Sequence, residues 1–250
     1  MGTRTWALLA ATVAFSAACG GRPAPADDSA GALAPADTPS TTASPAKTTT
    51  PTDSGPTLVA RASTELAVSP QPGATPSHHL PATTPFGSPR ALLVVGEQAD
   101  WLQVALPDRP NASTGWVRRN DVELRQVDER VEIDLASRTL TLVDGDEVVL
   151  TTPIAIGSPD APTPIGAFYV VDKLATGNPD DVYGPFAFGL SAHSDVLTEF
   201  AGGDGQVGIH GTNEPASIGE AVSHGCIRVP NDVAEVLEQR LHLGTPVTIG

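Results

Sequence analysis

The feature that most constrains this chain is a series of short apolar runs separated by turn residues. In RVEIDLASRTLTLVDGDEVVL (residues 130–150), apolar and polar side chains alternate before Asp144-Gly145-Asp146. Alternation with period two is typical of strands that bury one face, and Asp-Gly is a strong hairpin turn. Five further apolar runs follow: TPIAIG, GAFYVV, FAFGLS, VGIHG and TPVTI. This part of the chain is therefore predicted to be mostly β.

Only one stretch has the spacing of a helix, and it lies near the end of the chain. Asn231 or Asp232 can cap its start, and Gly244 is expected to end it. Four apolar residues are predicted to share its buried face: Val233, Val236, Leu237 and Leu241. We expect residues 127–250 to form one β-rich domain with this single main helix.

Residues 56–126 show a similar pattern without any helix. Candidate strands are TLVARAS, TELAVSP, RALLVVGEQADWLQVAL and STGWVRRNDVEL, while residues 70–89 are predicted to form one irregular loop. The pattern favours a small β-barrel. DWLQVALPDRPNASTGWVRRNDVEL resembles the C-terminal half of a bacterial SH3-type domain, so residues 56–126 are expected to form an SH3-like barrel. Trp101 and Trp116 are predicted to lie in its core rather than to stack on a ligand.

The start of the chain has the composition of an export segment. Arg4 precedes an apolar run, and Ser16-Ala17-Ala18 lead directly to Cys19. Residues 1–18 are therefore predicted to be a signal peptide, and the junction resembles a bacterial lipobox with Cys19 as the lipidated first mature residue. An ordinary secretory signal is the alternative. Residues 19–55, rich in Pro, Thr, Ser and Ala, are expected to remain a disordered linker.

The charge and the cysteine count narrow the function classes. The chain has 29 acidic and 14 basic residues and a formal net charge of -15. This balance argues against nucleic acid as a partner and against attachment to anionic lipid through basic residues. The chain has two cysteines, so lipidation of Cys19 would leave Cys226 as a single thiol in an exported protein.

That thiol lies in SHGCIRVPN (residues 223–231), two residues after His224. If the segment is extended, His224 and Cys226 point to the same side. An imidazole can accept the thiol proton, and a helix N-terminus or Arg228 can favour the thiolate. His210, at the end of VGIH, is a second candidate base. A zinc site made by the two histidines and Cys226, or an inert buried thiol, are weaker alternatives.

IHGTNEPASIGEAVSHGCIRVPNDV (residues 209–233) closely resembles the signature of the L,D-transpeptidase catalytic domain, the YkuD-type family, and IAIGSPDAPTPIGAFYV (residues 154–170) resembles its upstream segment. The resemblance implies that Cys226 is the nucleophile and His210 its base. It implies supporting roles for four neighbours: Ser223 and Gly225 in the turn, His224 at the site, and Arg228 as a nearby charge. Backbone N–H groups near Cys226 would form the oxyanion hole.

One position departs from the signature. Gly211 stands where longer-loop members of the family have Ser, so no side-chain hydroxyl at that position can orient His210. A backbone carbonyl is the candidate partner. The substrate-cleft candidates are Tyr183, Gly211 and Thr212, with Phe186 and Phe188 equally suited to core packing. Three further histidines are expected away from the chemistry: His193 at the surface or cleft rim, and His78 and His79 in solvent.

The resemblance implies a peptidoglycan L,D-transpeptidase that cleaves before the terminal D-Ala of a tetrapeptide stem and joins the third residue to an amine of another stem. An L,D-carboxypeptidase and a non-catalytic wall-binding lipoprotein are the alternatives. The expected partners are peptidoglycan stem peptides and, through the lipid, a membrane. We expect an exported, monomeric protein of the cell envelope that uses no cofactor and no metal.

Overall fold

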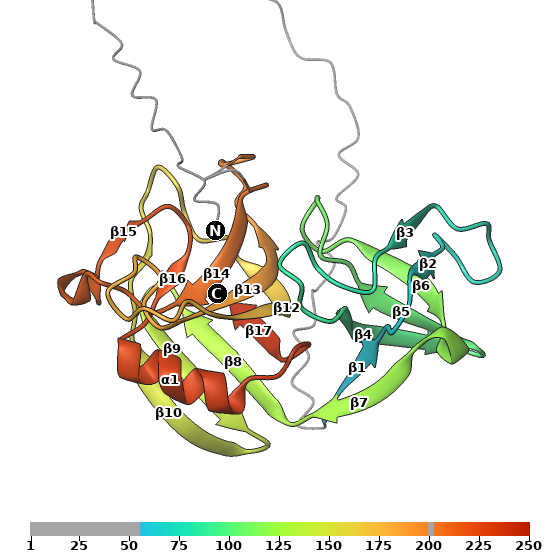
Figure 1. Cartoon of the computed structure of the whole chain (residues 1–250), viewed down its shortest axis with the longest axis horizontal. Helices are drawn as coiled ribbons and strands as arrows, with labels where there is room; N and C mark the ends of the chain where they lie inside the picture. The colour runs from blue at the N-terminus through green and yellow to red at the C-terminus, as the bar shows by residue number, and fades with distance from the viewer. Residues whose placement is uncertain (1–55, 200–202) are drawn as a thin grey trace, which may run out of the picture. The chain divides into compact units, whose positions relative to one another are not determined.

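A computed structural model describes residues 56–199 and 203–250, and the predicted signal peptide, Cys19 and linker lie outside them. The N-terminal part is a five-stranded antiparallel sheet in the order β6-β5-β4-β1-β7, with a separate pair β2-β3 (Figure 1). These strands are β1 (Thr57–Arg61), β2 (Leu66–Val68), β3 (His78–Leu80), β4 (Ala91–Gln98), β5 (Trp101–Ala105), β6 (Thr114–Arg118) and β7 (Glu123–Val127), with a 3-10 turn at Arg119–Asp121.

The C-terminal part is an eight-stranded sheet in the order β10-β9-β8-β17-β12-β13-β14-β16. Its strands are β8 (Glu129–Asp134), β9 (Thr139–Asp144), β10 (Glu147–Pro153), β12 (Gly166–Ala175), β13 (Phe186–His193), β14 (Gln206–His210), β16 (Ile227–Arg228) and β17 (Pro246–Ile249). A parallel pair, β11 (Ile156–Gly157) and β15 (Ala221–Ser223), a 3-10 turn at Pro215–Ser217 and the helix α1 (Asn231–Arg240) complete it. Within the described residues, no helix is both long enough and apolar enough to cross a membrane.

The predicted alternation is present in the first hairpin of this sheet. Val131 and Ile133 of β8 are buried while Glu132 between them is exposed. Gly145 turns the chain from β9 to β10 with φ +55°, a conformation that glycine adopts without strain. The mostly β fold with one helix is thus confirmed.

Strand β12 joins the two parts because both of its faces are buried. Phe168 and Val170 pack into the core of the eight-stranded sheet, whereas Tyr169 and Val171 pack into the core of the N-terminal part. The hydroxyl of Tyr169 also donates to the carbonyl of Ala105 at 3.0 Å. The continuous apolar run of this strand is explained by burial on both faces. A separate SH3-like domain over residues 56–126 remains a prediction.

Two expectations for the N-terminal part were wrong. The region 70–89 is not one irregular loop, because β3 lies inside it and pairs with β2. Trp101 and Trp116 are not core residues but are partly exposed, and the Arg118 guanidinium lies 4.5 Å from the centre of the Trp101 ring. The core is made instead by aliphatic neighbours on the opposite strand face, such as Leu102 and Val117.

The helix prediction was right in position and wrong in detail. The N-cap is Pro230 with no side-chain hydrogen bond, and the helix ends at Arg240 rather than at Gly244. Val236 is 37% exposed, and Ala234 is buried beside Leu237 instead. Successive helical residues are about 100° apart, so Val236 is turned away from the face that Leu237 buries.

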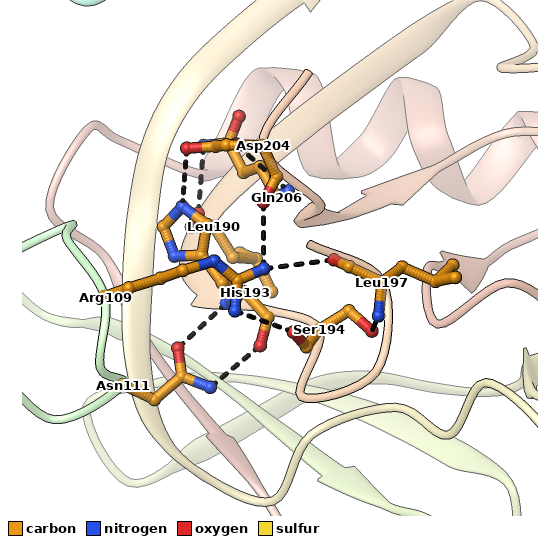
Figure 2. A network of polar contacts seen from close by, with 8 residues as sticks. All are labelled: Arg109, Asn111, Leu190, His193, Ser194, Leu197, Asp204 and Gln206. Atoms are coloured by element: carbon orange, nitrogen blue, oxygen red, sulfur yellow. Dashed lines mark hydrogen bonds and ion pairs between the residues drawn. The ribbon is translucent and has the colours of Figure 1, made fainter. Parts of the chain in front are cut away.

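A second set of contacts ties the two parts together around the connection between β13 and β14. Asn111 pairs with the backbone of His193 in both directions, accepting from its N–H at 2.9 Å and donating to its carbonyl at 2.8 Å. The Arg109 guanidinium donates to three carbonyls, those of Ser194, Leu197 and Asp204. Figure 2 shows both side chains pointing toward this segment.

His193 lies in the middle of this network rather than at the surface or a cleft rim. It is only 3% exposed, and its Nε2 lies 3.1 Å from the Asp204 carboxylate. Its Nδ1 is buried and has no hydrogen-bond partner among the described residues. The sequence expectation for His193 was therefore wrong, because Asn111 holds its backbone inside the protein. His79 is exposed as expected, but His78 is partly buried and lies 3.7 Å from Asp108.

Candidate active site

The two central residues of the motif lie on neighbouring segments of the sheet. Strand β14 ends at His210 and pairs in parallel with β16, which begins directly after Cys226, so that Ile209 is opposite Ile227. Both isoleucines are fully buried in the core. Since side chains alternate along a strand, His210 is directed to the other face of the sheet. The backbone of Gly208, two residues before His210, is near enough to the Cys226 thiol to lower its pKa.

The ring of His210 is held by its own loop. Its Nδ1 lies 2.6 Å from the carbonyl oxygen of Gly211, and the side chain is buried. A carbonyl can only accept, so Nδ1 carries the proton and Nε2 is left as the basic nitrogen. The carbonyl partner expected for His210 is therefore present, and it belongs to Gly211 itself.

Gly211 and the loop after it are packed too tightly for a side chain. A Cβ on Gly211 would lie 2.4 Å from the Asn231 Oδ1 and 2.9 Å from Pro185. The same Asn231 oxygen accepts from the N–H of Thr212 at 2.7 Å. Asn231, expected as a helix cap, instead fixes the segment that carries the partner of His210.

The environment of His210 favours the neutral imidazole. Burial lowers its pKa to about 4, and the positive charge of Arg228 acts in the same direction. The hydrogen bond to Gly211 and the negative charge of Asp181 act against this, but burial dominates. His210 is therefore neutral at pH 7, and so able to accept a proton.

Cys226 is half-buried, and its pKa is raised by burial. The Gly208 backbone and the charge of Arg228 lower that pKa, yet they do not outweigh burial. The charge of Arg228 thus acts in the direction expected from the sequence, although it does not make the thiolate the resting form. The resting pair is a neutral thiol and a neutral imidazole, and the proton has to move during the reaction.

The segment SHGC is a turn rather than an extended strand. Gly225 has φ +114°, which favours glycine. The hydroxyl of Ser223 accepts from the Gly225 N–H at 3.1 Å and donates to the Cys226 carbonyl at 2.6 Å. His224 is exposed at this turn while Cys226 is half-buried, so the two side chains do not share one environment.

Arg228 and Tyr183 border the pair. Arg228 donates to the carboxylate of Glu214 at 2.6 Å, and its charge acts on both His210 and Cys226. Tyr183 is 39% exposed and meets the His210 ring edge to face, with 4.9 Å between ring centres. The pKa of the Tyr183 hydroxyl is raised, first by burial and then by charge on Cys226 and Asp181.

Of the three cleft candidates, Tyr183 alone has an exposed side chain. Gly211 and Thr212 are buried, and the Thr212 hydroxyl accepts from the N–H of Glu214. These two residues shape the loop instead of lining an open cleft. Phe188 is a core residue, and Phe186 packs partly buried against the same core.

Thr163 was missed by reasoning from the sequence. Its hydroxyl accepts from the Gly157 N–H at 2.8 Å and donates to the Gly225 carbonyl at 2.9 Å. It therefore links β11 to the turn that carries Cys226. The only signal was its position in the upstream segment of the resemblance, between two prolines in APTPIG.

Comparison with known proteins agrees with this geometry. The family model of the YkuD L,D-transpeptidase catalytic domain matches residues 128–249. The YkuD protein of Bacillus subtilis is 38% identical over 119 residues, which are 48% of this chain and 64% of that protein. The YqjB protein of the same organism is 33% identical over 133 residues, covering 49% of this chain and 71% of that protein.

Among solved structures, a mutant L,D-transpeptidase from Enterococcus faecium shares 27% sequence identity with this chain. The match covers 49% of this chain and 50% of the Enterococcus faecium chain. Its TM-score is 0.38, which is too low for this likeness to support a functional conclusion. The chain spans less than two thirds of the length of the Bacillus subtilis YkuD protein. The family match falls on the sheet that carries His210 and Cys226, and the chain belongs to the YkuD-type L,D-transpeptidase catalytic-domain family.

Proposed function

We propose that this protein is a peptidoglycan L,D-transpeptidase in which Cys226 carries the acyl group. The observation that carries the proposal is the pairing of β14 with β16, which brings His210 beside the turn that holds Cys226. The hydrogen bond to Gly211 leaves the Nε2 of His210 free to accept a proton. Family membership supports the same reaction class.

In the first step, the thiol sulfur attacks the carbonyl carbon of the third stem residue while the thiol proton moves to Nε2 of His210. The negative oxygen that forms needs hydrogen-bond donors, and the N–H of Cys226 is the candidate closest to the nucleophile. The bond to the terminal D-Ala then breaks, and the imidazolium returns its proton to the leaving amine. A thioester on Cys226 and free D-Ala result.

In the second step, an amine of a neighbouring stem attacks the thioester and gives a proton to His210. The thiolate leaves and recovers that proton, so the enzyme returns to its neutral resting pair. If water takes the place of the amine, the product is a tripeptide, and the protein is an L,D-carboxypeptidase. A protein that only binds the wall would form neither product.

The test is to incubate the full chain and its Cys226→Ala variant with disaccharide-tetrapeptides and to follow the products by mass spectrometry. The wild type should form cross-linked dimers with release of D-Ala. The activity of the variant should be lower by a factor of about 10⁴ or more. Tripeptide without dimer would indicate a carboxypeptidase, and equal product from both proteins would refute the role of Cys226.

We also propose that the protein is exported and attached to a membrane through a lipid on Cys19. Export, and lipid attachment at Cys19, would place the domain in the cell envelope beside its substrate. The support is the sequence pattern around Cys19 and the wall substrate implied by the family. Labelling of cells with a fatty-acid probe, for the wild type and for Cys19→Ala, would detect or refute the lipid.

A further inference from the structure

Thr163 holds the peptide bond that precedes the nucleophile. It is only 5% exposed, and its hydroxyl makes two hydrogen bonds in opposite roles. It accepts from the Gly157 N–H and donates to the carbonyl oxygen of Gly225, at 2.8 and 2.9 Å. The hydroxyl has one hydrogen, so accepting from Gly157 leaves that hydrogen for Gly225.

The backbone around Gly157, whose N–H donates to the Thr163 hydroxyl, is tightly packed. A Cβ on Gly157 would lie 2.3 Å from the carbonyl oxygen of Ala161 and 2.5 Å from the nitrogen of Thr163. The backbone of β11 therefore packs directly against the segment that carries Thr163. This contact makes the hydroxyl a fixed point rather than a free rotor.

The peptide group between Gly225 and Cys226 contains both the carbonyl that Thr163 holds and the N–H of the nucleophile. A trans peptide is planar, so its oxygen and its N–H point in opposite directions. When the oxygen is held on one side, the direction of the Cys226 N–H on the other side is set. A hydrogen bond to the oxygen also polarises the group and strengthens the N–H as a donor.

Several other polar groups of the turn are already engaged. The Gly225 N–H donates to Ser223 Oγ, and the same hydroxyl donates to the Cys226 carbonyl. Among the described residues, no acceptor is assigned to the Cys226 N–H. That N–H is the donor of this turn that remains available to a negative oxygen on the reacting carbon.

We propose that Thr163 is a positioning residue that aims and strengthens the Cys226 N–H as an oxyanion-hole donor. The inference rests on the proposed function only in assuming that Cys226 forms acyl intermediates. Thr163 does not touch the substrate. It acts through the Gly225–Cys226 peptide.

The test compares two reactions of the Cys226 thiol in the full-length wild type, Thr163→Val and Thr163→Ser. Acylation by p-nitrophenyl acetate passes through a negative tetrahedral oxygen, whereas alkylation by iodoacetamide does not. Thr163→Val should slow acylation about tenfold, because the N–H remains but is no longer held, and should leave alkylation within about twofold. Thr163→Ser, which keeps the hydroxyl, should restore most of the acylation rate.

Thr152→Val is the matched control, because Thr152 is also buried and its hydroxyl donates to the carbonyl of the next residue, Pro153. It should change neither rate. Equal acylation by the wild type and Thr163→Val would overturn the inference, as would an equal loss of both reactions or an equal loss in Thr163→Ser. Because neither reagent is a wall substrate, an inactive wild type in the tetrapeptide assay would refute the proposed function separately.

Discussion

Two polar networks hold this protein together, and they differ in what they hold. Around the turn that carries Cys226, neutral hydroxyls of Ser223 and Thr163 bind backbone groups next to this proposed nucleophile. Around the β13–β14 connection, Arg109 and Asn111 reach across more than 80 residues of sequence to bind the backbone carbonyls of Ser194 and His193. The two hydroxyls of the first network each donate and accept a hydrogen bond, while the second network contains the Nδ1 of His193, which has no hydrogen-bond partner among the described residues.

From this difference we expect the network around the Cys226 turn to affect the reaction and the network around the β13–β14 connection to affect folding. A hydroxyl that orients one peptide beside a thiol controls the direction of a donor, in addition to what its own hydrogen bonds contribute to stability. Side chains that join distant parts of the chain stabilise the folded state against the entropy of separation. Changes in the first network should therefore lower rates, and changes in the second should lower stability.

The largest effect on activity is expected from replacing His210, the proposed general base. His210→Gln removes the nitrogen that we propose accepts the thiol proton, so kcat/KM for the tetrapeptide should fall about 10³-fold. The midpoint of urea unfolding at pH 7.5 is measured beside it, because the buried His210 ring also contacts Gly211 and Tyr183. An unchanged kcat/KM in the folded variant would contradict the role of His210 as the base.

The pH dependence of stability sharpens the same contrast. The folded pKa of His210 is about 4, below the ordinary value of 6.5, so the unfolded chain binds a proton between these values while the folded chain does not. Stability is thus retained above pH 6.5 and should fall, on the order of 3 kcal/mol, as the pH drops toward 4. Urea unfolding across this range measures it.

The control for this pH effect is His210→Gln, which has no titrating group at that position. Between pH 6.5 and 4, its unfolding free energy should fall less than that of the wild type, and the difference should equal the contribution of His210. An identical slope in both proteins would show that other groups cause the loss, and that the buried imidazole contributes nothing.

The second network should respond in the opposite way. Asn111→Ala leaves the buried backbone N–H and carbonyl of His193 without their partner, which should cost about 2 kcal/mol of unfolding free energy. Turnover below the new melting temperature should stay within about twofold of wild type. Asn120→Ala, at an exposed position in the Arg119–Asp121 turn, is the matched control and should change neither quantity. A large loss of turnover in the folded Asn111→Ala protein would break the division between the networks.

Much of the fold could be predicted from the sequence because it follows local periodicity. The alternation in residues 130–150 predicts β8 and β9 with the turn at Gly145, and the late apolar spacing predicts α1. Details that depend on neighbours in space could not be predicted. Val236 was placed in the core because its spacing is close to helical, and His193 was placed at the surface because nothing local shows the contact with Asn111.

The same distinction holds for the candidate site, where features of the local sequence were predicted and contacts between distant residues were not. The motif and its resemblance placed His210 and Cys226, and the absence of a hydroxyl at Gly211 pointed to a carbonyl partner. The net direction of the Cys226 pKa shift depends on burial, which the local sequence does not reveal, whereas the effect of the Arg228 charge was expected correctly. Thr163 lies 62 residues before the carbonyl that it binds, and no local pattern joins the two.

The most direct measurement is the identity of the acylated residue. The full chain is mixed with disaccharide-tetrapeptide in slight excess, quenched in acid within milliseconds to seconds, digested, and mapped by mass spectrometry. The peptide that contains Cys226 should carry the disaccharide-tripeptide acyl group, with D-Ala released in equal amount and no adduct in Cys226→Ala. An acyl group on another residue, or release of D-Ala by Cys226→Ala, would contradict the central role of this thiol.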